Sequence, residues 1–157
     1  SVALWTGGEI AAIERRAGHR HGELVLPMLE RLLAQRGLSV RALDAVAFGA
    51  GPGAFTGLRI ACGVAQGLAL ARGIPLLGVS TLETVAEESG AQRAVVCLDA
   101  RMREVYYAAL ERASGGWREA VAAQCVAPAA APLSAMLIET IAISTTSTSA
   151  TMPPIGR

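Results

Sequence analysis

A glycine-rich turn leads into a long apolar helix over residues 49–72, and this stretch constrains the fold most. The turn holds three glycines within five residues, so the backbone can bend sharply there. A short apolar run over residues 44–48 precedes the turn and predicts a buried strand. After the turn, apolar residues recur at helical spacing from an expected N-cap at Thr56, and Gly73 ends the helix. The sequence therefore predicts a strand, a turn and a helix of an α/β protein.

The start of this helix could hold an anion, because free N–H groups and the helix dipole converge there. Gly51, Gly53 and Thr56 are the candidate residues. A Walker loop needs a lysine after its last glycine, and the chain has no lysine, so that version is excluded. A dinucleotide fingerprint needs an acid at the end of the next strand, and the first acid beyond that strand is Glu83. A tight turn without a ligand is the simpler interpretation.

The helix after the turn is apolar on nearly every side. Between Leu58 and Leu70 its only long polar side chains are Arg59 and Gln66. A helix of this kind must be covered on more than one side. One side belongs on its own sheet, and the other is covered either by a helix of the same domain or by a partner protein. The sequence leaves these two alternatives open.

Composition narrows the class of protein. With 157 residues, 52% of them apolar, the chain can form one domain or two small lobes with a buried core. A net charge of +1 gives no electrostatic footprint for direct nucleic-acid binding, and no apolar run is long enough to span a bilayer. Three cysteines without Cys-x-x-Cys spacing fit a reducing cytoplasm and give no zinc site. His19 and His21 lack a third ligand, so a solvated loop is predicted there.

The remaining elements follow from hydrophobic periodicity. They are a hairpin over 1–15, an amphipathic helix over 23–36, a strand over 75–79, a helix over 80–89 opened by a capping box, and strands over 93–98, 105–110 and 117–126. The strands after residue 93 repeat the organisation of the first hairpin. We therefore expect a first lobe over residues 1–92 and the start of a second lobe over 93–127. Residues 128–157, rich in Ala, Pro, Ser and Thr, predict a weakly ordered or aberrant tail.

Asp99 is the best candidate for a chemical carboxylate, because it ends a buried strand beside a turn. An ion pair with Arg101 or Arg103 explains the same position without chemistry. The chain has no Ser/His/Asp or Cys/His set at a recognisable spacing and no metal-ligand cluster. The sequence therefore predicts no catalytic residue, no metal ligand and no cofactor.

Two motifs carry a family resemblance. The decapeptide GPGAFTGLRI over residues 51–60, followed by AQGLA over 65–69, resembles the signature of the TsaB family, glycoprotease-like bacterial proteins of tRNA threonylcarbamoyladenosine biosynthesis. The resemblance covers most of residues 1–112. It implies an actin/sugar-kinase-like (ribonuclease H-like) α/β lobe with a mixed sheet and flanking helices, followed by part of a second lobe of the same type. The family's opening strand, with its Asp-Thr-Ser/Thr turn, and most of the second lobe have no match.

The resemblance also implies function by association. Family members resemble actin-type folds that have lost catalytic machinery; they pair with themselves or with the catalytic subunit TsaD, and the ATPase TsaE joins the assembly. On this basis we expect a cytoplasmic scaffold or activator that meets tRNA only indirectly and binds no membrane. The expected interface lies on the helices over 56–72 and 23–36 and comprises Leu58, Ala61, Cys62, Ala65, Gln66, Ala69, Met28 and Leu32.

Two other functions stay open as alternatives. A nucleotide-binding phosphotransferase or ATPase of the actin/sugar-kinase type would hold phosphate on the amides of residues 49–53 and magnesium on Asp99. A protease-like hydrolase, which the family's older label suggests, is disfavoured because the chain lacks the necessary nucleophile and ligand sets. Calorimetry with ATP and Mg²⁺ separates an ATPase from a scaffold, because a scaffold should release little heat.

Overall fold

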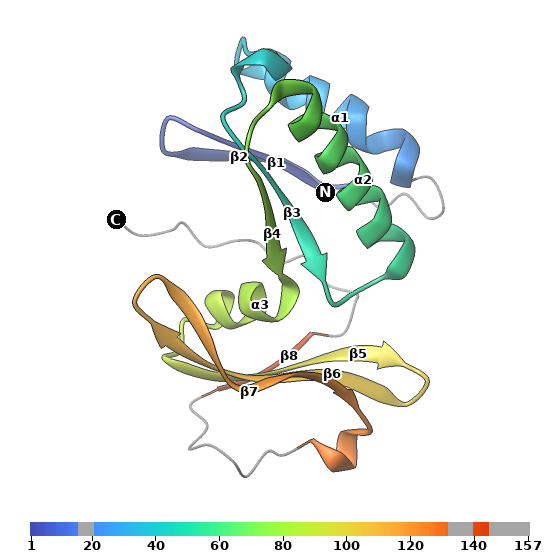
Figure 1. Cartoon of the computed structure of the whole chain (residues 1–157), viewed down its shortest axis with the longest axis vertical. Coiled ribbons are helices and arrows are strands. Elements are labelled where there is room, and N and C mark those ends of the chain that lie inside the picture. Colours follow the sequence, from blue (N-terminus) through green and yellow to red (C-terminus); the bar gives the residue numbers. More distant parts are fainter. Residues whose placement is uncertain (16–20, 132–139, 145–157) are drawn as a thin grey trace. The chain divides into compact units, whose positions relative to one another are not determined.

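The fold is given by a computed structural model that describes residues 1–15, 21–131 and 140–144. The chain divides into two compact units (Figure 1). The first comprises Ser1–Gly49 and Ala54–Gly78, and the second comprises Ala50–Gly53 and Val79–Arg157. In this division the helix that precedes residue 92 packs with the second unit, and the predicted lobe boundary after residue 92 stays a prediction.

The first unit opens with an antiparallel hairpin. Strand β1 (Val2–Thr6) pairs with β2 (Glu9–Ile13), and Gly7 and Gly8 form the turn between them. Because side chains alternate along a strand, Leu4 points to the core while the cross-strand neighbours Trp5 and Ile10 stay exposed on the opposite face.

Helix α1 (His21–Gln35) covers the inner face of the hairpin. Its buried leucines at positions 29, 32 and 33 form one cluster with Leu4 of β1, and the spacing of these leucines is that of one helical face. A short 3-10 turn, η1 (Val40–Ala42), follows the helix, and Leu68 of the next helix reaches the same cluster. This cluster is the hydrophobic core of the first unit.

The glycine turn lies between β3 (Val46–Gly51) and α2 (Phe55–Arg72), and β4 (Leu76–Ser80) follows the helix. Strands β3 and β4 form a second two-stranded sheet, and Figure 1 shows them running in the same direction with α2 as the crossover. The predicted strand, turn and helix are thus confirmed. The strand extends farther than predicted, through Gly49 to Gly51.

The second unit is a helix on a four-stranded mixed sheet. Its elements are α3 (Thr81–Ser89), β5 (Arg93–Arg101), β6 (Glu104–Ala113), β7 (Gly116–Val126), the 3-10 turn η2 (Pro128–Ala130) and β8 (Thr140–Ser144). The strand order is β7-β6-β5-β8, in which β8 runs parallel to β5 and the other neighbours are antiparallel.

The sheet of the second unit buries side chains on both faces. On one face, Leu82 and Ala86 of α3 pack with Val96 and Leu98 of β5 and with Leu110 of β6. On the other face, Val95, Tyr107 and Ala109 form a second cluster. A strand buried on both faces needs a near-continuous apolar run, which explains the sequence AVVCL over residues 94–98.

The C-terminal prediction needs one correction. Residues 128–157 were expected to be weakly ordered or aberrant, yet residues 140–144 form β8, because they complete the hydrogen bonding of the open edge of β5. Residues 132–139 and 145–157 lie outside the described residues, as does His19 of the predicted solvated loop. None of the described helices is both long and apolar enough to cross a membrane.

Candidate protein-interaction site

Helix α2 is the element on which the sequence centred its functional prediction. Its N-cap is Ala54, whose side chain makes no capping bond, so the predicted cap at Thr56 is wrong and Thr56 lies within the first turn. The helix ends as predicted at Gly73. This residue has φ +64°, a conformation that favours glycine, and its N–H bonds the carbonyls of Ala69 and Leu70.

One side of α2 is occupied by its own unit. Ala65 and Ala69 are buried there, and Leu68 joins the core beneath α1. A Cβ atom added to Gly22 of α1 would lie 3.7 Å from the Ile60 side chain, so the two helices approach closely at this point. Helix α1 of the same unit therefore covers one side of α2, as the first of the two alternatives from the sequence proposes.

The other side of α2 faces away from the described part of its unit. Phe55 and Leu70 are exposed to 67% and 86%. The Arg59 guanidinium lies over the Phe55 ring at 3.8 Å from its centre, a cation–π contact that holds the ring at the surface. Helical spacing places Gly63 and Gly67 on this side, between the two apolar residues.

Gly63 and Gly67 have no internal reason to be glycine. A Cβ atom at either position would meet nothing within 4 Å among the described residues, and neither backbone is in the left-handed region. Glycine in a helix interior destabilises the helix by about 1 kcal/mol relative to alanine. What the two residues provide is a shallow surface, between Phe55 and Leu70, against which a second helix could approach closely. We call the surface formed by Phe55, Arg59, Gly63, Gly67 and Leu70 the exposed α2 face.

The predicted interface residues fall into three groups. Leu58, Ala61 and Cys62 are half-buried, and Gln66 is exposed at the edge of the exposed α2 face. Ala65, Ala69, Met28 and Leu32 are buried within the first unit. The buried four belong to the chain's own core, and their contact with a partner stays a prediction. Gly63 and Gly67 are small residues at which the sequence already suggested that a second helix could approach, whereas Phe55 and Leu70 were not among the predicted residues, although they lie on the same side of the helix.

The anion-site candidates are spread over β3, the turn before α2, α2 itself and β5. Gly51 is buried with φ +100° and is joined to Pro52 by a cis peptide bond, while Gly53 and Thr56 are exposed. Asp99 of β5 is exposed, and its carboxylate accepts a hydrogen bond from the Arg101 backbone N–H at 2.8 Å. The expected ion pair with an arginine side chain is thus replaced by a bond to backbone.

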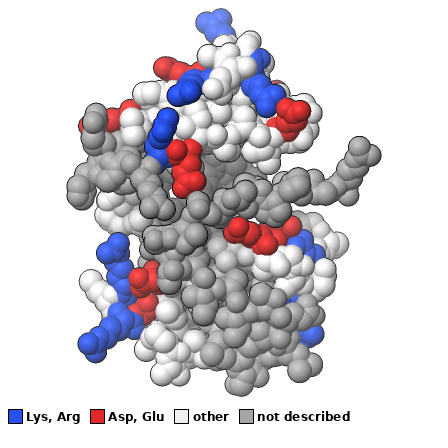
Figure 2. Space-filling view, turned by 180° about the vertical axis from the view of Figure 1, so that it is seen from behind, with Lys and Arg blue, Asp and Glu red and all other residues white. Residues whose placement is uncertain are grey.

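Metal chemistry has no support in the described part of the chain, where no three His, Cys, Asp or Glu side chains converge to hold an ion. Figure 2 shows acidic and basic side chains in small mixed groups on the face it draws.

The sequence matches a family model described as TsaD: tRNA N6-adenosine threonylcarbamoyltransferase over residues 13–153, well past the motif resemblance. Two relatives carry the name tRNA threonylcarbamoyladenosine biosynthesis protein TsaB. The protein from Escherichia coli (strain K12) is 44% identical over 120 residues, which are 74% of this chain and 52% of the relative. The protein from Haemophilus influenzae is 38% identical over 140 residues, 82% of this chain and 59% of the relative.

Two solved structures from Pseudomonas aeruginosa resemble the fold. One, described as an uncharacterized protein with similarity to peptidase YEAZ, has a TM-score of 0.73 at 42% identity, covering 80% of this chain and 60% of that one. The other, YeaZ, has a TM-score of 0.72 at the same identity. Fold and comparisons together define an α/β protein of the actin-like, ribonuclease H-like class. Within this class, the chain belongs to the TsaB family. It spans 52% to 59% of the length of the two curated relatives.

Proposed function

We propose that this chain is a non-catalytic scaffold subunit in the biosynthesis of threonylcarbamoyladenosine in tRNA, acting in the cytoplasm. It pairs through the exposed α2 face with the catalytic subunit TsaD or with a second copy of itself, and TsaE joins the larger assembly. Family membership supports the pathway, since the names of the curated relatives state it.

The observation that carries the proposal is the pair of glycines between two exposed apolar residues. Gly63 and Gly67 weaken α2 and relieve no contact within the described chain. Phe55 and Leu70 present apolar surface that water solvates poorly. A partner helix lying along this face would bury both side chains, and the glycines would let its backbone come close. A single partner would therefore explain both the helix stability lost at the two glycines and the exposure of the two apolar side chains.

The physical source of activation would be differential affinity. A scaffold that binds the reactive conformation of TsaD more tightly than other conformations shifts the population toward it. Such a mechanism requires no catalytic group on this chain.

The experiment is titration of this chain against TsaD from the same source, comparing wild type with Gly67→Arg. The new side chain has open space and an ordinary helical backbone, so the fold should be retained while the surface is blocked. We expect affinity for TsaD to fall by at least about tenfold. Ala120→Arg, at an exposed position of β7, adds the same charge elsewhere and should bind like wild type. Equal binding by Gly67→Arg and wild type would refute the proposed face.

A further inference from the structure

The turn that joins β5 to β6 has an unusual backbone. Arg101, Met102 and Arg103 have φ values of 63°, 52° and 64°, three successive non-glycine residues in the left-handed region. Arg101 pairs with Glu104, so Met102 and Arg103 are the two central residues of a hairpin turn. Turns with positive φ at both central positions strongly prefer Asn-Gly. Methionine and arginine are therefore costly choices here.

The side chains of this turn gain little within the chain. Met102 is 94% exposed, and both arginines are exposed. Neither guanidinium has an ion pair or hydrogen bond among the described residues, whereas the two nearby carboxylates are engaged. Asp99 accepts the Arg101 backbone N–H at 2.8 Å, and Glu104 accepts the Cys125 thiol at 3.4 Å.

Strained backbone conformations cluster at sites of function, such as active sites and ligand clamps. Here the turn presents an apolar tip between two cations, and interface anchors are enriched in methionine and arginine. We propose that the β5–β6 turn is a docking knob. It inserts Met102 into an apolar pocket of a protein partner, and carboxylates at the rim of that pocket pair with Arg101 and Arg103. This inference rests on the proposed function, because it takes TsaD as the partner.

A protein pocket fits the turn better than an RNA backbone does. Phosphates would form ion pairs with both arginines but would not bury the exposed methionine side chain between them. An apolar pocket with an acidic rim accounts for all three side chains at once. Contact with tRNA is the competing outcome, and the experiment separates the two.

The test replaces the central residues with those that the backbone prefers, in the double variant Met102→Asn with Arg103→Gly. Because Asn-Gly suits the turn, the melting temperature should stay the same or rise. We expect the Kd for TsaD from the same source to increase about tenfold or more. A Kd within about twofold of wild type overturns the inference, since only the side chains have been removed.

Two further variants keep the result clear. Met102→Asp introduces a residue that tolerates the left-handed backbone and replaces the apolar tip with a negative charge. It should therefore also weaken TsaD binding. Arg118→Ser removes an exposed arginine of β7 in the same unit and should bind TsaD like wild type.

The other outcomes separate this inference from the proposed function. If Gly67→Arg loses TsaD and the double variant binds it normally, the proposed function stands and the docking knob is refuted. If the double variant lowers only the affinity of the assembled complex for tRNA, the turn contacts RNA and the inference is likewise refuted. Loss of TsaD affinity in both variants supports both proposals.

Discussion

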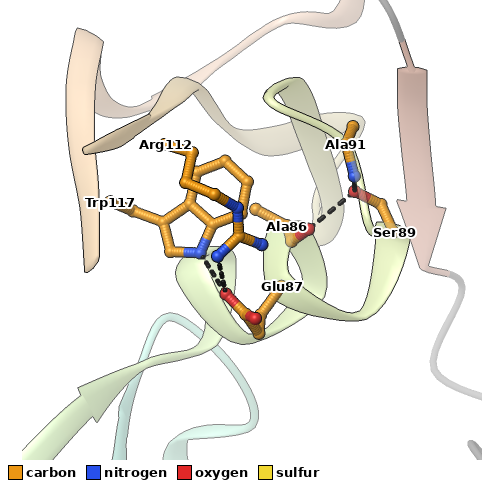
Figure 3. A network of polar contacts seen from close by, with 6 residues as sticks. All are labelled: Ala86, Glu87, Ser89, Ala91, Arg112 and Trp117. Atoms are coloured by element: carbon orange, nitrogen blue, oxygen red, sulfur yellow. Dashed lines mark hydrogen bonds and ion pairs between the residues drawn. The ribbon is translucent and has the colours of Figure 1, made fainter. Parts of the chain in front are cut away.

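Trp117 donates its indole N–H to the Glu87 carboxylate across 2.9 Å, and this bond ties α3 to the sheet of the second unit (Figure 3). Arg112 forms an ion pair with the same carboxylate oxygen at 3.0 Å, and its guanidinium lies 4.6 Å from the centre of a Trp117 ring. The three side chains come from α3, β6 and β7. They therefore join elements that the chain places up to 30 residues apart.

The first prediction concerns the pH dependence of this network. Hydrogen bonds from Arg112 and then from Trp117 hold the pKa of Glu87 below its ordinary value. A carboxyl whose pKa is lowered by folding contributes stability above its unfolded pKa, and this contribution is lost as the pH falls through the folded pKa. Because Glu87 is largely exposed, the effect should be only about 0.5 kcal/mol. Glu87→Gln should flatten the loss of unfolding free energy below about pH 5.

Urea unfolding across the acid range measures this difference. Glu88 is exposed on the same helix, so Glu88→Gln is the matched control and should leave the wild-type pH profile in place. A profile for Glu87→Gln that overlies the wild type at every pH would show that the network contributes nothing to stability.

Leu82 is the side chain through which α3 anchors its unit, and it is 2% exposed among residues of β5 and β6. Leu82→Ala removes buried apolar volume and leaves a cavity, so we expect a loss of about 3 kcal/mol in unfolding free energy. Leu77→Ala makes the same change at a 62% exposed position and should cost much less. Equal losses in denaturant unfolding would contradict the assignment of the core.

Much of this fold could be predicted because the sequence signals for helix ends match the conformations that the folded structure adopts. Gly73 has the conformation that only glycine adopts cheaply, so the end of α2 was readable from the sequence. The capping pair Ser80 and Glu83 likewise marked α3, and the Ser80 hydroxyl accepts the Glu83 N–H at 3.4 Å. Each of these signals is satisfied within a few residues of chain.

Long-range packing could not be predicted in the same way. Ala65 and Gly67 are both small residues of one apolar helix, and only the packing against the first unit makes Ala65 buried while Gly67 stays open. For the same reason the sequence could not tell which of the predicted interface residues on α2 are buried within the chain's own unit. The sequence predicted a polar turn over residues 99–104 but not its left-handed backbone, because methionine and arginine do not signal positive φ.

The third prediction concerns the reactivity of the Cys125 thiol. Desolvation, and then the hydrogen bond to the Glu104 carboxylate, raise the pKa of this thiol. Thiolate is the reactive form, so Glu104→Gln should speed alkylation of Cys125 several-fold at neutral pH. Burial raises the pKa of the Cys97 thiol independently of Glu104, so Cys97 serves as an internal control, followed by mass spectrometry. An unchanged Cys125 rate would show that the carboxylate has no influence on the thiol.

The last prediction separates two glycines of the same helical segment. Gly67 has an ordinary helical backbone with open space around it, so Gly67→Ala should stabilise the chain by about 1 kcal/mol. Gly73 has φ +64°, so Gly73→Ala should destabilise it by about 1 kcal/mol although space is equally available. Thermal and urea unfolding measure both changes. If Gly67→Ala gains stability and weakens TsaD binding, the chain gives up helix stability at this position in favour of association. A gain in stability with undiminished binding would remove the main support for the exposed α2 face as an interface.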